Sequence, residues 1–296
     1  SPLFNRALSG QYPPASTLKP FVGMAALEAK TISWEKEILD SGKYLVEGDD
    51  RPYKGWKEGG HGMVDMNKAI IESSDVYFYS LAYDLTIKNL APFLEKFGFG
   101  KQSGLTKNEG TGILPSRKWK LGYIGEPWFK GDTINMGIGQ GYITATPLQI
   151  ASAYSVLANK GEFVQPRIIE KIGEENTKIV IKKNISLNDD KNWKRIEKSL
   201  LGVVEAKNGT ANNIYDKNIR IAGKTGTAQV KSIIETEYEL LRIDKSLRDH
   251  ALFVGYGPVE DPKLVVVAII ENGESGSAVA APLVRRAINL YSNNEK

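Results

Sequence analysis

The chain has 296 residues, 41% of them hydrophobic and 25% charged, which is typical of a folded globular protein and excludes an intrinsically disordered one. Its formal net charge is only +4 and its basic residues are mixed with acidic ones, so a nucleic-acid partner is not expected. The absence of cysteine excludes disulfides, thiolate metal sites and cysteine catalysis.

The first predicted element is a helix that begins at about Ser16, after the pair Pro13-Pro14. Each proline fixes its own φ and keeps the preceding residue extended, so the helix begins only after them. Ser16 and Lys19 are three residues apart and therefore lie on one helical face. A lysine can deprotonate a serine when burial or nearby positive charge lowers the lysine pKa. The pattern predicts a nucleophile and its base, although Ser33 and Lys36 match the same spacing.

The middle of the chain is predicted to be mainly helical. Apolar periodicity and capping residues indicate helices at five places: Met66 to Glu72, Val76 to Leu85, Thr86 to Phe97, Thr146 to Asn159 and Asp190 to Ala206. The glycine-bearing passages 41–62 and 104–131 are predicted to be irregular. Ser73 and Asp75 lie at the break between the first two helices, where a serine can point into a cleft instead of capping a helix. Ser73 is therefore a second candidate catalytic residue.

Strand patterns gather near the C-terminal end. The predicted strands are Ile219 to Val230, His250 to Gly257 and Lys263 to Glu271, and a hairpin is predicted from Arg167 to Ile172 and Thr177 to Ile181. A closing helix is predicted from Ala278 to Tyr291, and the charged segment 232–248 is the best candidate for a mobile excursion. This order of elements indicates an α+β fold, in which a helical lobe is inserted into a sheet domain.

The first of the late strands carries Lys224-Thr225-Gly226-Thr227. Alternate side chains of a strand point to the same face, so Thr225 and Thr227 lie together. Gly226 removes the side chain between them, which is expected to let a substrate backbone approach. An ammonium and two hydroxyl groups on one strand edge are suited to docking a carboxylate, so this segment is predicted to bind substrate.

Three motifs follow one another along the chain: Ser16-x-x-Lys19, Ser73-x-Asp75 and Lys224-Thr225-Gly226. This ordered set is found in penicillin-binding proteins and serine β-lactamases. The chain resembles the transpeptidase domain of the class B penicillin-binding proteins, and within them the elongation-type penicillin-binding protein 2 subfamily of Gram-negative bacteria. The resemblance extends over nearly the whole chain, through Gly60-His61-Gly62, Gly137-Ile138-Gly139-Gln140-Gly141, Asn208-Gly209-Thr210-Ala211 and Arg248-Asp249-His250.

The resemblance implies an α/β sandwich of the β-lactamase/transpeptidase type, an antiparallel sheet flanked by helices with an inserted all-helical lobe. Residues 1–296 would form one transpeptidase domain, with a sheet lobe at about 1–27 and 216–296 and a mainly helical lobe at about 28–215. The family places a membrane anchor, a pedestal and a β-hairpin before the nucleophile helix. These are absent from this sequence, so we expect the sheet to lack strands.

The implied function is peptidoglycan D,D-transpeptidation during cell elongation, which cross-links stem peptides through a serine acyl-enzyme and is inhibited by β-lactams. The implied location is the periplasmic face of the cell inner membrane. The expected partners are stem peptides, β-lactam antibiotics and membrane proteins of the elongation complex, namely a glycosyltransferase and a shape-determining scaffold protein. No cofactor is expected.

The resemblance also implies catalytic roles. Ser16 would attack the penultimate carbonyl of a D-Ala-D-Ala terminus, with Lys19 as its proton acceptor. Ser73 and Lys224 would pass a proton to the departing D-alanine, and Asp75 completes the catalytic set.

Substrate binding is assigned to the late strand. Thr225 and Thr227, on either side of Gly226, would hold the terminal carboxylate. The backbone amides of Ser16 and Thr227 would form the oxyanion hole, a type of donor whose removal typically costs about 3 kcal/mol in the barrier.

Two alternatives stay open. A D,D-carboxypeptidase or slow serine β-lactamase would use the same residues but pass the acyl group to water instead of an amine. A non-enzymatic β-lactam sensor or elongation-complex scaffold would bind without turnover. The Glu-x-x-Leu-Asn pattern of the class A deacylating glutamate is missing from the sequence, which favours a transpeptidase over a class A lactamase.

Relatives in this subfamily can hold a structural zinc through two aspartates, the histidine of the Gly-His-Gly segment and a cysteine in the middle of the Ser-x-Asp motif. Here His61 is present, but Ser74 and Gly55 stand at the cysteine and at one aspartate position. A hydroxyl is a poor zinc ligand at neutral pH, so no metal is expected. His250 is expected to have a structural role. Relatives usually have glycine at position 15, and we expect Ala15 to alter the packing there without altering the chemistry.

Overall fold

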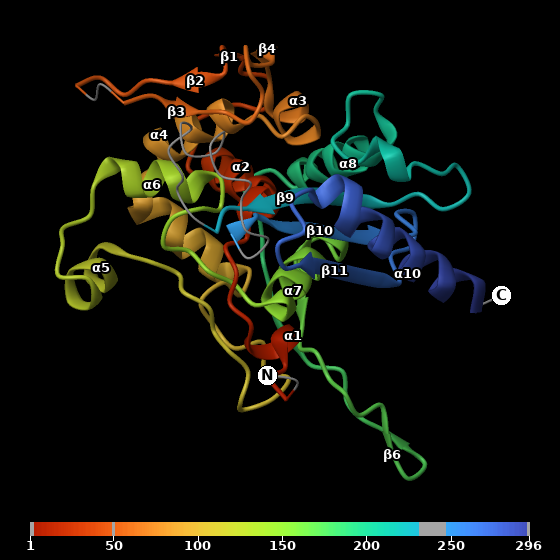
Figure 1. Cartoon of the computed structure of the whole chain (residues 1–296). Coiled ribbons are helices and arrows are strands. Elements are labelled where there is room, and N and C mark those ends of the chain that lie inside the picture. The colour runs from red at the N-terminus through yellow and green to blue at the C-terminus, as the bar shows by residue number, and fades with distance from the viewer. Residues whose placement is uncertain (1–2, 49–50, 231–246, 295–296) are drawn as a thin grey trace.

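The computed structural model describes residues 3–48, 51–230 and 247–294. A three-stranded antiparallel sheet lies at its centre (Figure 1), in the order β11 (Leu264–Ile270), β10 (His250–Gly257), β9 (Ala222–Ala228). Seven of the eight residues of β10 are buried, so both faces of the sheet are covered. Helices α7 (Pro147–Ala158) and α10 (Ala281–Asn294) pack against β10 and β11. The predicted strand pair and closing helix are confirmed.

Helix α2 (Lys19–Glu28) forms the middle of the hydrophobic core. Residues 19–26 are all buried, as expected of a helix that is packed on every side. The ring of Phe21 lies with its centroid 5.0–5.5 Å from those of Phe97, Phe99 and Tyr154. Helix α2 packs against α4 (Asp75–Lys96), while α8 (Lys191–Glu205) packs against β9. One continuous core therefore joins the sheet to the helices that precede it in the sequence.

Several local predictions are confirmed by their caps and breaks. Helix α3 (Met66–Ile71) begins after Asp65, whose side chain accepts a hydrogen bond from the amide of Lys68. Thr86, with φ 60° and ψ 159°, interrupts α4 at a boundary that the sequence predicts. His250 accepts a 3.0 Å hydrogen bond from the amide of Asn272, in agreement with a structural role.

One prediction about the irregular passage 104–131 is wrong, because helix α5 (Arg117–Tyr123) forms there with Ser116 as its N-cap. Lys120 is its one buried residue. A short helix that buries a lysine and no apolar residue has no apolar stripe, so its sequence gives no helical period to detect.

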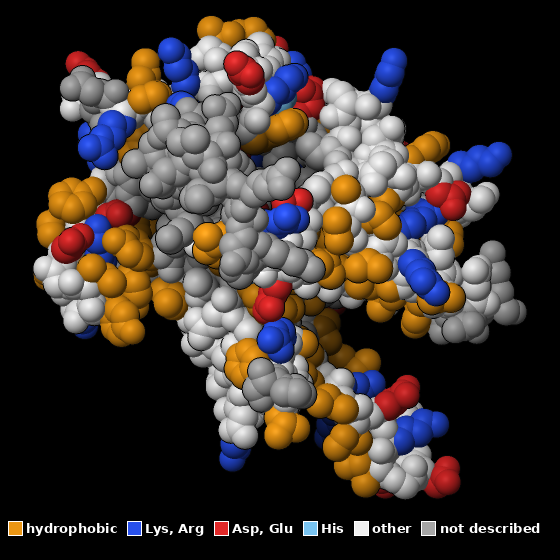
Figure 2. Space-filling view, viewed as in Figure 1, with side chains coloured by type: hydrophobic (Ala, Val, Ile, Leu, Met, Phe, Trp, Pro, Cys, Tyr) orange, Lys and Arg blue, Asp and Glu red, His pale blue; other side chains and the backbone are white. Residues whose placement is uncertain are grey.

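The remaining elements are short: α1 (Arg6–Ser9), η1 (Ala15–Leu18), α6 (Lys130–Gly137), η2 (Asn212–Ile214) and η4 (Gly276–Ala280), with the strand pairs β1 (Ile38–Asp40) and β4 (Gly62–Val64), β2 (Lys43–Tyr44) and β3 (Tyr53–Lys54), β5 (Glu162–Val164) and β8 (Ile181–Asn184), β6 (Lys171–Ile172) and β7 (Glu175–Asn176). The β6–β7 pair confirms that a hairpin forms in this region, but its bounds differ from the prediction, because β7 lies within the predicted turn 173–176. It projects from the body (Figure 1) and carries hydrophobic side chains along its length (Figure 2). The segment 232–248 lies almost wholly outside the described residues.

The sheet lies in the C-terminal part of the chain, and 28–215 holds most of the helices, which confirms the α+β class. The exact division into two lobes stays a prediction. Strand β11 forms one edge of the sheet, and no strand among the described residues pairs with its outer side. In the part of the chain that the structure describes, no helix combines the length and apolar character needed to cross a bilayer.

Candidate active site

Ser16 lies in the 3₁₀ turn η1, directly before α2. The predicted helix start is confirmed, with a tighter first turn than an α-helix has. Ser16 is partly exposed, whereas Lys19 is fully buried. The turn packs against β9, since a Cβ at Gly226 would lie 3.2 Å from Thr17 Cγ2 and 3.5 Å from the carbonyl oxygen of Pro14. The first and third motifs are therefore neighbours in the fold.

The residue before Ser16 has a left-handed backbone, since Ala15 has φ 49°. Its amide donates a 2.9 Å hydrogen bond to the carbonyl of Gly139. Gly139 has φ +72°, and a Cβ there would lie 2.1 Å from the carbonyl oxygen of Ala15. The loop 137–141 therefore supports the nucleophile turn at close range. A left-handed position favours glycine, which gives a physical reason for the glycine usual in relatives.

We expect Ala15→Gly to be nearly neutral for stability. Glycine adopts the left-handed φ without the cost of about 1 kcal/mol that alanine carries there, but the methyl group of Ala15 is buried, and its loss costs about 0.8 kcal/mol. The free energy of urea unfolding measures the effect. The matched control Ala25→Gly, in the middle of buried α2, has no such backbone relief and should destabilise by about 1 kcal/mol or more. A loss of stability in Ala15→Gly as large as that in Ala25→Gly would contradict the argument.

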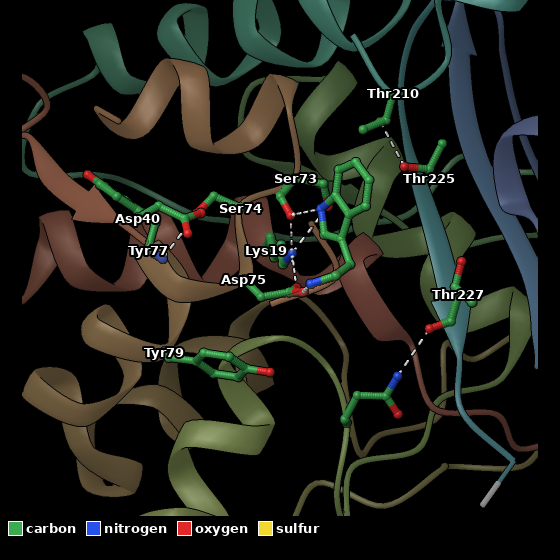
Figure 3. Close-up of polar contacts among 12 residues, drawn as sticks. Lys19, Asp40, Ser73, Ser74, Asp75, Tyr77, Tyr79, Thr210, Thr225 and Thr227 are labelled. Carbon is green, nitrogen blue, oxygen red and sulfur yellow. Dashed lines mark hydrogen bonds and ion pairs between the residues drawn. The ribbon is translucent and has the colours of Figure 1, made fainter. Parts of the chain in front are cut away.

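The ammonium of Lys19 is enclosed by the second motif (Figure 3). Lys19 Nζ donates hydrogen bonds to Asp75 Oδ1 at 2.6 Å, to the carbonyl of Ser73 at 2.8 Å and to Ser73 Oγ at 3.1 Å. All three hydrogens of the ammonium are thereby used. The ion pair is buried, with the side chains of Lys19 and Asp75 exposed by 0% and 11%. The structure thus joins the first two motifs directly.

Ser73 turns its carbonyl and its hydroxyl toward Lys19 because its backbone is left-handed, with φ 59°. It lies between α3 and α4. Its neighbour Ser74 caps α4 by accepting a 3.2 Å hydrogen bond from the amide of Tyr77. As predicted, Ser73 does not cap the helix, and its hydroxyl faces Lys19 instead.

Lys224 of β9 is also fully buried, and its Nζ makes two long contacts of 3.5 Å with the carbonyl and the hydroxyl of Thr225. The Thr225 hydroxyl lies 2.8 Å from the hydroxyl of Thr210 (Figure 3). Thr210 belongs to the segment 208–211, which carries part of the resemblance, but sequence reasoning gives it no role. It orients the hydroxyl that is predicted to bind the substrate carboxylate.

The two buried lysines influence each other. Burial lowers the pKa of Lys19, although the carboxylate of Asp75 acts in the opposite direction. Burial, and then the positive charge of Lys19, lower the pKa of Lys224 well below its usual value. The positive charge of Lys19 thus contributes to the lowered pKa of Lys224.

The structure gives Gly226 a role different from the predicted one. A Cβ at this position would lie 3.1 Å from Leu252 Cβ on β10 and 3.2 Å from Thr17 Cγ2 on η1. The protein itself fills the space that was predicted to admit a substrate backbone. Glycine here allows β9 and the nucleophile turn to approach each other.

Thr227 is exposed at the end of β9, and its carbonyl accepts a 3.1 Å hydrogen bond from Gln140 Nε2. In an antiparallel ladder each residue uses its N–H and C=O on the same side, so the amide of Thr227 also faces away from β10. The loop 137–141 thus contacts both the turn that holds Ser16 and strand β9. Sequence reasoning includes this loop in the resemblance but gives Gln140 no role.

A hydrogen-bonded cluster built on Asp40 supports the second motif. Asp40 Oδ2 accepts a 2.6 Å bond from Ser74 Oγ and lies 2.7 Å from His61 Nδ1, while Oδ1 accepts a 2.8 Å bond from the Gly42 amide. Burial alone would raise the pKa of Asp40, but these bonds outweigh it and hold the pKa below its usual value. The Ser74 hydroxyl donates its hydrogen to Asp40 and is a poor zinc ligand. The described residues also hold no group of three histidine, cysteine, aspartate or glutamate side chains that could bind a metal ion. The cluster therefore does not fit a zinc site.

Trp56 is a site residue that the sequence does not indicate. Its amide donates a 2.9 Å hydrogen bond to Asp75 Oδ2, and its indole Nε1 donates a 3.0 Å bond to the carbonyl of Ser73. It lies between β3 and β4, in a passage predicted to be irregular. The residues next to Trp56 in the sequence do not predict this role, because the groups that accept its hydrogen bonds belong to Ser73 and Asp75, in another part of the chain.

A family model described as penicillin binding protein transpeptidase domain matches residues 1–289. The chain belongs to this transpeptidase family. Peptidoglycan D,D-transpeptidase MrdA of Haemophilus influenzae is 42% identical to it, over 99% of this chain and 46% of that protein. The crystal structure of Pseudomonas aeruginosa PBP2 in complex with WCK 5153 superposes with a TM-score of 0.88 at 39% identity, covering 98% of this chain and 61% of that one. The complex between PBP2 and MreC from Helicobacter pylori gives a TM-score of 0.83 at 32% identity, covering 100% and 52%.

The predicted fold type and the resemblance to elongation-type penicillin-binding protein 2 are therefore confirmed. The chain spans about half the length of the curated relatives that it matches. Within this transpeptidase domain the second motif encloses the Lys19 ammonium, and Gly226 of the third motif lies against the turn that holds Ser16. The catalytic roles of the single residues stay predictions.

Proposed function

We propose that the chain is the catalytic unit of a peptidoglycan D,D-transpeptidase that cross-links stem peptides during cell elongation and is acylated by β-lactams. The observation that carries this proposal is the enclosure of the buried Lys19 ammonium by the Ser73–Asp75 turn, beside the turn that holds Ser16. Membership in the transpeptidase family and relatives named peptidoglycan D,D-transpeptidase support it.

In the first half-reaction Ser16 Oγ attacks the penultimate D-alanine carbonyl, an ester forms, and the peptide bond to the terminal D-alanine breaks. Lys19 takes the hydroxyl proton, a role that its lowered pKa supports. Ser73 Oγ, 3.1 Å from Lys19 Nζ, offers a path for that proton to the departing amine. Lys224, whose pKa is lowered further, assists the same transfer.

The substrate is held by the open edge of β9. The hydroxyls of Thr225 and Thr227 receive the terminal carboxylate, and Thr210 orients the first of them. The outward orientation of the Thr227 amide supports its use, together with the Ser16 amide, in the oxyanion hole. In the second half-reaction an amine of another stem attacks the ester, a peptide bond forms, and Ser16 regains its proton.

The wider setting of the reaction rests on the relatives. The complex of Helicobacter pylori PBP2 with MreC supports a shape-determining scaffold protein as a partner. A peptidoglycan synthase complex that coordinates polymerization and crosslinking matches this chain with a TM-score of 0.82 at 30% identity, which supports a glycosyltransferase as a partner. We place the domain on the periplasmic face of the inner membrane, and the family resemblance supports this placement.

The fate of the acyl-enzyme tests the proposed function. The purified protein is incubated with a pentapeptide that ends in D-Ala-D-Ala and with a D-amino acid as acceptor, and the products are identified by mass spectrometry. A transpeptidase yields the exchanged peptide in an amount that rises with the acceptor. Hydrolysed tetrapeptide alone would point to a D,D-carboxypeptidase, rapid loss of a penicillin adduct to a β-lactamase, and a lasting adduct without peptide turnover to a sensor.

A further inference from the structure

Trp56 and Lys19 share hydrogen-bond acceptors. The Asp75 carboxylate accepts from Lys19 Nζ through Oδ1 at 2.6 Å and from the Trp56 amide through Oδ2 at 2.9 Å. The Ser73 carbonyl accepts from Lys19 Nζ at 2.8 Å and from the Trp56 indole at 3.0 Å. Two acceptors that stabilise the ammonium of Lys19 are therefore also bonded to a residue of a different loop.

An acceptor that is shared between Trp56 and Lys19 interacts less strongly with the positive charge of Lys19. An oxygen that already accepts a bond from a neutral N–H offers less electron density to a second donor, so the ammonium form of Lys19 gains less from it. Trp56 thereby opposes Asp75, whose charge favours the ammonium form. The catalytic proton transfer needs the neutral amine, so each bond from Trp56 works in favour of that transfer.

We propose that Trp56 is a positioning residue that lowers the proton affinity of Lys19 by donating to the two acceptors that Lys19 also uses. The proposal rests on the proposed acyl transfer at Ser16 and deepens it, because it names what holds the base ready at neutral pH. Trp56 is 61% exposed, so its substitution leaves the hydrophobic core intact.

Other groups also face Lys19. Asp75 and the Ser73 hydroxyl come from the turn before α4, Asp40 acts on it from β1, and Lys224 lies near it on β9. The ring of Phe78 on α4 lies 5.6 Å from Lys19 Nζ. His61, which bonds to Asp40, lies with its ring centroid 5.5 Å from that of Trp56, and Trp56→Phe keeps an aromatic ring against it. A shift of the Lys19 titration in Trp56→Phe is therefore assigned to the lost indole N–H.

The test is the pH dependence of acylation in Trp56→Phe, which keeps an aromatic ring and removes the indole N–H. The rate of adduct formation with a fluorescent penicillin falls at low pH as Lys19 becomes protonated. We expect the midpoint of this fall to move upward by about 0.5–1 pH unit, the effect of one lost hydrogen bond, while the plateau at high pH changes little. Asp75→Asn removes the opposing charge and should move the midpoint downward.

A control variant completes the design. Trp34→Phe, in which the changed ring packs under Arg195 away from the site, should leave the midpoint unchanged. An equal loss of rate at every pH in Trp56→Phe, with the midpoint unmoved, would overturn the inference and leave the proposed function standing. Failure of the wild type to form any adduct would instead overturn the proposed function.

Discussion

Ser16→Ala is expected to abolish the covalent adduct with penicillin. The substitution removes the hydroxyl that is proposed to form the acyl bond, and loss of a nucleophile of this kind lowers the rate by about 10⁵- to 10⁶-fold. The other hydroxyl of the turn, that of Thr17, is buried and donates to the carbonyl of Pro14, so it does not replace Ser16. The fold should be unaffected, because Ser16 is partly exposed and the turn is supported by the Ala15–Gly139 hydrogen bond. Intact-mass spectrometry after penicillin treatment measures the result directly, as presence or absence of the added mass.

The chain supplies its own control for this experiment. Ser33 and Lys36 have the same spacing as Ser16 and Lys19, but both are exposed, so this pair has no enclosed site around it. Ser33→Ala should therefore be labelled as fully as the wild type. An adduct that persists in Ser16→Ala would place the nucleophile elsewhere and remove the basis of the proposed mechanism.

Lys19→Met is expected to have the second largest effect, on stability as well as on acylation. It removes the proton acceptor and leaves the Asp75 carboxylate, whose side chain is 11% exposed, without its cation. Breaking a buried ion pair from one side typically costs about 3–5 kcal/mol. The free energy of unfolding in urea should fall by this amount, and the penicillin adduct should form far more slowly.

The double variant Lys19→Met with Asp75→Asn separates the two effects. Without the orphaned charge much of the lost stability should return, which corresponds to a coupling energy of about 2 kcal/mol between the two sites. Acylation should remain lost, because the base is still missing. Strictly additive losses of stability in the two single variants and the double variant would show that the pair is not coupled and that the burial argument is wrong.

The parts of the site that the sequence predicts are those whose chemistry is local. Pro13-Pro14 predicts the turn that presents Ser16, and the break at 73–75 predicts a serine released from capping. Both depend on the backbone preferences of a few consecutive residues. The order of the motifs then identifies the family, and the comparisons confirm it.

The parts that the sequence does not predict depend on long-range contacts with the backbone. Trp56 donates a hydrogen bond to the carbonyl of Ser73, and Gln140 donates one to the carbonyl of Thr227. Every residue has a backbone carbonyl, so a sequence pattern does not show which carbonyls accept such bonds. Gly226 is a second case in which the sequence does not predict a long-range contact. The sequence reveals that a side chain is missing, but it does not reveal that Leu252 and Thr17 occupy the space.

Strand β11 has a consequence for handling the protein. Its seven residues, 264–270, are all aliphatic, and each is only half-buried. With no proline and no charge among them, its outer side is a template for another chain, and such strands favour aggregation. Lys263 and Glu271 flank it as gatekeepers at its two ends, but nothing charged interrupts it between them. The isolated chain should therefore precipitate at concentrations that a form with this edge covered would tolerate.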